Sequence, residues 1–110
     1  MSDHYHDPDD LRYFKEMAAL APTDFHAWLN LDKIVPREDG AIPRKHRELI
    51  ALAVALTTQC VYCIEAHVKG ARVAGGSKEG VVEAAFIAAA LRAGGAATHG
   101  ALALKLYGQS

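Results

Sequence analysis

Two cysteines that lie three positions apart are the residues of this 110-residue chain best suited to redox chemistry. They form the motif Cys60-Val61-Tyr62-Cys63, and residues with this spacing share one face of a helix. If Thr58 is the N-cap of that helix, Cys60 takes the second helical position and Cys63 closes the first turn. The free N–H groups and the dipole at a helix N-terminus stabilise a thiolate. The pair is therefore expected to form a reversible disulfide.

A zinc site and a pair of inert buried cysteines are the alternatives for this motif. Zinc ribbons use the same spacing but need a second pair of ligands, and the chain has no third cysteine. Zinc would have to use Cys60, Cys63, His67 and Glu48. Three of these ligands would lie on one helical stripe, which makes a poor tetrahedron, so no bound metal is expected.

A histidine and a glutamate are placed to move protons at the cysteines. His67 follows Cys63 by four residues, so it lies one helical turn away on the same stripe. Glu48 and His67 are equidistant from the junction between Thr57 and Thr58, where an antiparallel helical hairpin would turn. The two side chains should then lie level with each other. Glu48 would orient His67 and balance its charge, and His67 would activate a cysteine.

Helices are the elements that must position these residues, since no segment shows sustained strand alternation. We expect an all-α fold of about six helices, with the cysteine motif at the N-terminus of the fourth. Residues 1–6 are expected to be flexible, and residues 7–110 to form a single domain. The expected helices cover residues 8–20, a segment from Thr23 to just before Pro36, and residues 43–57, 59–74, 78–93 and 96–107, with Gly94-Gly95 separating the last two.

Apolar residues make up 51% of the chain, and the charged residues are unevenly distributed. Residues 1–50 hold 17 charged side chains, whereas residues 51–110 hold eight. Such a segment cannot easily cover itself with a solvated surface, so we expect a homo-oligomer that buries part of it. The net charge of -1 argues against a nucleic-acid partner.

Membrane insertion is the competing explanation for so much apolar sequence. The longest run without a charged residue or histidine, Leu49–Ile64, has 16 residues and is shorter than the roughly 18–20 that a spanning helix needs. The second candidate, residues 84–104, is interrupted by Arg92 and His99. The first residues are acidic, unlike a signal peptide. The sequence thus predicts a cytoplasmic protein with no membrane partner.

The run ELIALAVALTTQCVYCIEAH, residues 48–67, resembles the carboxymuconolactone decarboxylase family, and within it the alkylhydroperoxidase D-like branch. That branch has a Glu, eleven residues, Cys-x-x-Cys, three residues and a His. Glu48, Cys60, Cys63 and His67 match at every spacing. The resemblance covers about residues 25–107.

The resemblance implies an all-α fold that assembles as trimers or hexamers with the site near a subunit interface. It also implies reduction of a peroxide or exchange of a disulfide, with an external thiol or dithiol as electron donor. Cys63 would be the peroxidatic cysteine, Cys60 the resolving cysteine, and Glu48 and His67 the proton relay. The spacing alone also allows Cys60 to be the nucleophile.

Two further residues are candidates for the pocket wall. Well-characterised peroxidases of that branch have a His directly before the second cysteine, where this chain has Tyr62. His99 lies in an apolar helix and is a candidate for packing or for the pocket.

Two other functions remain open from the sequence: a lyase of the decarboxylase type acting on a small ring acid, and a non-catalytic redox-sensing or metal-binding module. No cofactor is expected, because the paired glycines end helices and follow no strand, unlike a nucleotide-binding loop.

Overall fold

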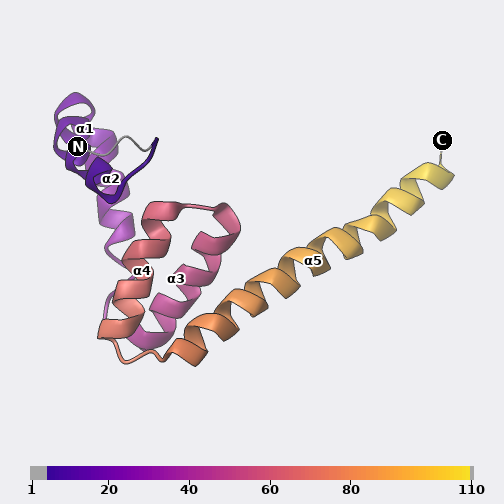
Figure 1. Cartoon of the computed structure of the whole chain (residues 1–110). Helices are drawn as coiled ribbons and strands as arrows, with labels where there is room; N and C mark the ends of the chain where they lie inside the picture. The colour runs from indigo at the N-terminus through magenta and orange to yellow at the C-terminus, as the bar shows by residue number, and fades with distance from the viewer. Residues whose placement is uncertain (1–4, 110) are drawn as a thin grey trace. The chain divides into compact units, whose positions relative to one another are not determined.

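The computed structural model describes residues 5–109, which form five α-helices and one 3₁₀-helix, with no strand among them (Figure 1). The prediction of an all-α fold is therefore confirmed. The described chain divides into two compact units, one ending at Arg37 and the other starting at Glu38. The N-terminal segment expected to be flexible, residues 1–6, lies mostly outside the described residues.

The first unit contains the 3₁₀-helix η1 (Pro8–Tyr13) and the helices α1 (Phe14–Leu20) and α2 (Pro22–Asp32). Asp7 caps η1 and forms a capping box with Asp10. The predicted helix over residues 8–20 is thus a 3₁₀ turn followed by a short α-helix. Pro22 takes a first-turn position of α2 after Ala21, so this helix begins one residue earlier than the predicted segment from Thr23.

Three aromatic rings contact one another in the first unit, although Trp28 is still 44% exposed. The ring centroids of Phe14 and Phe25 lie 5.5 Å apart, and that of Trp28 lies 5.6 Å from Phe14 and 5.7 Å from Phe25. Edge-on and tilted packing of this kind is the arrangement that aromatic quadrupoles favour. These aromatic contacts therefore link α1 to α2.

The second unit is built on a hairpin of α3 (Arg44–Thr58) and α4 (Val61–Val73), which run antiparallel (Figure 1). Leu52 and Ala55 of α3 and Ala71 of α4 are buried between the helices. Gln59 links the two helices in the left-handed conformation, with φ 59° and ψ 40°. This hairpin places residue 48 opposite residue 67, as the symmetry of the sequence predicts.

The last helix, α5 (Lys78–Gly108), begins at Ser77, whose side chain accepts the N–H of Gly80 as an N-cap. The prediction of two helices separated at Gly94-Gly95 is wrong, because α5 continues through both glycines. A glycine inside a helix costs about 1 kcal/mol relative to alanine, and the alanine-rich residues on either side favour helix strongly.

Only the first half of α5 is covered by its own chain. Ala84 and Ala88 are its buried residues, and many of its large apolar side chains are exposed: Val82, Phe86, Ile87, Leu91, Leu102, Leu104, Leu106 and Tyr107. In Figure 1 the C-terminal half of α5 extends beyond the α3–α4 hairpin. By length and composition alone, α5 is also long and apolar enough to cross a membrane.

Candidate redox site at the start of α4

The two cysteines lie at the N-terminus of α4 and form a disulfide. Their Cα atoms are 5.3 Å apart, within the range of about 4.4–6.8 Å that disulfides span. Cys60 is the N-cap and Cys63 is the third residue of the helix, so both cysteines lie two positions earlier in the helix than the sequence analysis predicts. Both side chains are partly exposed, which leaves the disulfide accessible to a small thiol.

The local backbone explains this shift. Thr58 is the last residue of α3, and its hydroxyl donates to the carbonyl oxygen of Ala55 at 3.3 Å instead of capping α4. The left-handed Gln59 turns the chain, and the Cys60 N–H returns to the Ala55 carbonyl at 3.2 Å. The turn therefore fixes Cys60 at the point where α4 begins.

The start of α4 supplies the polar environment of Cys60. The N–H of Cys63 donates to the Cys60 Sγ at 3.3 Å, which is the usual role of an N-cap acceptor. After reduction, this N–H and the helix dipole would face any negative charge on Cys60. The geometry thus favours cleavage of the disulfide with Cys60 as a stabilised thiolate.

Glu48 and His67 form the side-chain contact that the hairpin symmetry predicts. Oε1 of Glu48 lies 3.1 Å from Nδ1 of His67. Glu48 is buried, with 3% of its surface exposed, and the His67 side chain is 20% exposed. A carboxylate at Nδ1 favours the tautomer that carries its proton there, which leaves the Nε2 lone pair as a proton acceptor.

Glu48 has another possible partner, the arginine one turn earlier on its own helix. Arg44, one turn before Glu48, lies with Nη1 3.6 Å from Oε1 of Glu38 instead. Glu48 is therefore paired with the histidine of α4 and not with the arginine of its own helix. His67 lies one turn after Cys63 on α4. While Cys60 and Cys63 are joined as a disulfide, no described hydrogen bond links His67 to either sulfur atom.

Gly70 is a residue of the site that the sequence analysis missed. It is buried on α4, three residues after His67, and a Cβ built on it would overlap the Glu48 carboxylate. The only feature of the sequence that could have indicated Gly70 is a glycine inside a helical segment. Such a glycine by itself indicates only that the helix is less stable than it would be with alanine.

The two candidates for the pocket wall lie apart from each other in the chain. Tyr62 lies on α4 between the cysteines and is half-buried. His99 is exposed on α5, and its Nδ1 lies 2.8 Å from the Gly95 carbonyl oxygen of the same helix. Their predicted contribution to a pocket stays a prediction.

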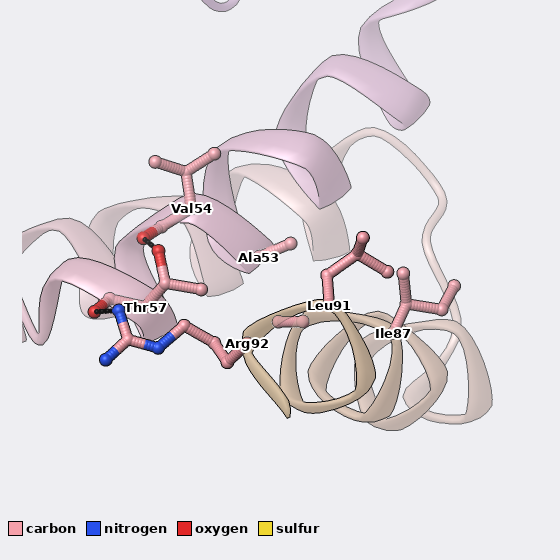
Figure 2. A pocket seen from close by; sticks show the side chains of 7 residues that line it. Ala53, Val54, Thr57, Ile87, Leu91 and Arg92 are labelled. Carbon is pink, nitrogen blue, oxygen red and sulfur yellow. Dashed lines mark hydrogen bonds between the residues drawn. The ribbon is translucent and has the colours of Figure 1, made fainter. Parts of the chain in front are cut away.

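An apolar cavity of about 320 Å³ lies between α3 and α5 (Figure 2). Arg92 lies at its edge, and its Nη1 donates to the Thr57 carbonyl oxygen at 3.2 Å. This contact satisfies a carbonyl in the last turn of α3, where a cation is favourable. The lining residues are Ala53, Val54, Thr57, Ile87, Ala88, Leu91 and Arg92.

The grouping of His, Cys, Asp and Glu side chains shows which kinds of ligand the described residues could hold. Between residues 5 and 109, no three His, Cys, Asp or Glu side chains gather as a group that could hold a metal ion. The chemistry that the site can perform with its own groups is thiol–disulfide conversion beside a proton acceptor.

Comparison with known proteins places these residues in a family. Residues 22–106 match the model of the carboxymuconolactone decarboxylase family. The chain is also 50% identical over 101 residues to a protein of Paracoccus denitrificans described as "Uncharacterized protein 4 in cox locus", covering 86% of this chain and 90% of that protein. The chain belongs to the carboxymuconolactone decarboxylase family.

Proposed function

We propose that the protein is a thiol-dependent peroxide reductase or disulfide oxidoreductase of the alkylhydroperoxidase D-like type. One observation carries the proposal: a Cys60–Cys63 disulfide at the start of α4, followed one turn later by a histidine paired with a buried carboxylate. The disulfide supplies the redox couple, and the Glu48–His67 pair supplies a proton acceptor and donor.

The reaction begins with the reduced pair. His67 accepts the proton of the Cys63 thiol, and the thiolate attacks one oxygen of a hydroperoxide. The O–O bond breaks, Cys63 becomes a sulfenic acid, and the departing alkoxide takes a proton to leave as an alcohol. Glu48 stabilises the imidazolium that forms between these two proton transfers.

The second half of the reaction restores the disulfide and then the dithiol. The Cys60 sulfur attacks the sulfenic sulfur of Cys63, an S–S bond forms, and the hydroxyl leaves as water. An external dithiol then exchanges with the disulfide, so that the donor becomes oxidised and both cysteines regain their protons. The N-cap position of Cys60 favours its release as a thiolate when the donor attacks Cys63.

Trapping the intermediate tests this order of events. In Cys60→Ser the resolving thiol is absent, so peroxide should leave a sulfenic acid on Cys63 that a dimedone-type reagent labels. In Cys63→Ser no comparable adduct should form on Cys60. Labelling on Cys60 alone would show that the order is reversed, and labelling on neither cysteine would contradict the peroxidase proposal.

We also propose that the protein acts as a cytoplasmic homo-oligomer, either a trimer or a hexamer. The exposed apolar side chains of α5 support this assembly, since a solvated helix would not carry so many. Arg92 argues against a membrane-spanning α5, because it lies near the middle of the helix and contacts the end of α3.

A further inference from the structure

The Glu48 carboxylate rests directly on the backbone of α4 at Gly70. Gly70 lies three residues after His67, so both residues face the same side of α4. A Cβ at position 70 would overlap Oε2 and Cδ of Glu48. The carboxylate thus occupies the volume that any other side chain at position 70 would need.

Glu48 lies in the buried part of the α3–α4 hairpin. It is 3% exposed, and Leu52 and Ala55, one and two turns further along α3, are 1% and 3% exposed. Protein interiors of this kind are close-packed, so moving the carboxylate requires moving its neighbours as well. Its position is therefore set jointly by His67 on one side and by Gly70 on the other.

Other described glycines have different surroundings. Gly75 has a φ of +91° and lies in the turn after α4, and Gly76 approaches the Ala71 carbonyl. The glycines of α5 from position 94 onward face open space. Gly70 is the described glycine whose missing side chain makes room for a carboxylate.

We propose that Gly70 is a positioning residue that holds the Glu48 carboxylate at Nδ1 of His67. The catalytic consequence rests on the proposed function, because it requires that His67 exchange protons with a cysteine. The structural consequence does not, because the contact between Glu48 and Gly70 exists whatever reaction the protein performs. The two consequences are therefore measured separately.

The first measurement compares Gly70→Ala with Lys69→Ala, an exposed neighbour on the same helix. Gly70→Ala should shift the His67 ring resonances in NMR spectra and lower kcat for peroxide reduction roughly tenfold or more, as expected when an orienting partner is lost, with KM little changed. Lys69→Ala should change neither. Wild-type His67 resonances in Gly70→Ala would overturn the proposal.

A double-mutant cycle with Glu48→Ala identifies the route of the effect. With the carboxylate absent, adding Gly70→Ala should neither lower the urea midpoint nor slow the residual reaction further. Equal losses in the two backgrounds would overturn the proposal, because Gly70 would then act through helix packing alone.

The double-mutant cycle still tests the proposal if Gly70→Ala does not fold, or if the protein does not reduce peroxides. If Gly70→Ala does not fold, folding of Glu48→Ala/Gly70→Ala supports the proposal, and failure of both contradicts it. Urea midpoints and NMR spectra report the coupling without any turnover. A coupled pair in a protein that is inactive toward peroxides would leave the role of Gly70 supported and peroxide reduction refuted.

Discussion

The Glu48 carboxylate is the one buried charged side chain among the residues that the structure describes. Burying a charge is costly unless a partner compensates it, and His67 is that partner at 3.1 Å. The sequence predicted this pair because a tight hairpin relates residues at equal distances from its turn. It did not reveal Gly70, because a glycine within a helix does not indicate which side chain occupies the space above it.

At the residue scale, His67→Ala should destabilise the fold. It removes the partner of a buried carboxylate, which costs about 1–3 kcal/mol when a buried polar group is left unsatisfied. Urea unfolding followed by circular dichroism measures the difference. His99→Ala, at an exposed position on α5, is the control and should stay within about 0.5 kcal/mol of wild type. Equal stabilities of His67→Ala and wild type would show that Glu48 has another compensating contact.

Also at the residue scale, Glu48→Gln should separate charge from shape. The amide fills nearly the same volume and can still contact Nδ1, but it cannot balance an imidazolium. Peroxide turnover should fall roughly tenfold or more, as it does when a partner that orients and charges a catalytic histidine is altered. Steady-state kinetics measure this loss. Unchanged turnover in Glu48→Gln would show that the negative charge has no part in the reaction.

At the element scale, the turn between α3 and α4 determines where the cysteines lie. The sequence predicts Thr58 as the N-cap of α4, because threonine is a common capping residue. In the structure Thr58 bonds back to Ala55, and Gln59 takes the left-handed conformation that ends α3. Glutamine has no particular preference for that conformation, so the sequence did not indicate it. The error in α5 has a different cause. The paired glycines predicted a break in the helix, but the alanine-rich residues on either side keep α5 continuous.

The left-handed Gln59 makes the turn testable. Gln59→Val should destabilise the fold by about 1–2 kcal/mol, because a β-branched residue is strained in that conformation. Gln59→Gly should be at least as stable as wild type, because glycine adopts it readily. Chemical denaturation of both variants measures the contrast. A Gln59→Val protein as stable as Gln59→Gly would contradict the described turn.

Arg92 connects α5 to this turn. Arg92→Ala should cost about 1 kcal/mol, because the Thr57 carbonyl and the negative end of α3 lose a cationic donor. Thermal or urea unfolding measures the loss, which should shrink at high salt. Lys105→Ala, also on α5 but far from α3 along the helix, should have less effect. An equal loss in both variants would show that the contact with Thr57 contributes nothing specific.

At the scale of the whole molecule, the exposed apolar surface of α5 is the feature to explain. The uneven charge distribution predicted it, because residues 51–110 have few charged side chains to cover themselves. In the proposed oligomer, a second copy of the chain covers the face that carries Phe86, whose side chain is 72% exposed. Burial of apolar surface in such an assembly contributes a favourable free energy of roughly 25 cal/mol per Å². The entropy cost of assembly opposes this contribution.

Phe86→Glu tests this assembly. A charge in an apolar interface is desolvated without a partner, so the variant should sediment as a smaller species than wild type. Lys69→Glu, on the exposed side of α4, is the control and should sediment as wild type does. A wild-type protein that sediments as a monomer would contradict the proposed oligomer.

Titration of free thiols before and after one equivalent of peroxide, with the intact mass as readout, tests the proposed redox cycle most directly. In the reduced wild-type protein, both Cys60 and Cys63 should titrate at first. After peroxide neither should titrate, and the mass should fall by a pair of hydrogens because the disulfide has formed. Two free thiols and an unchanged mass, with the peroxide unconsumed, would contradict the proposal that this pair reduces peroxides.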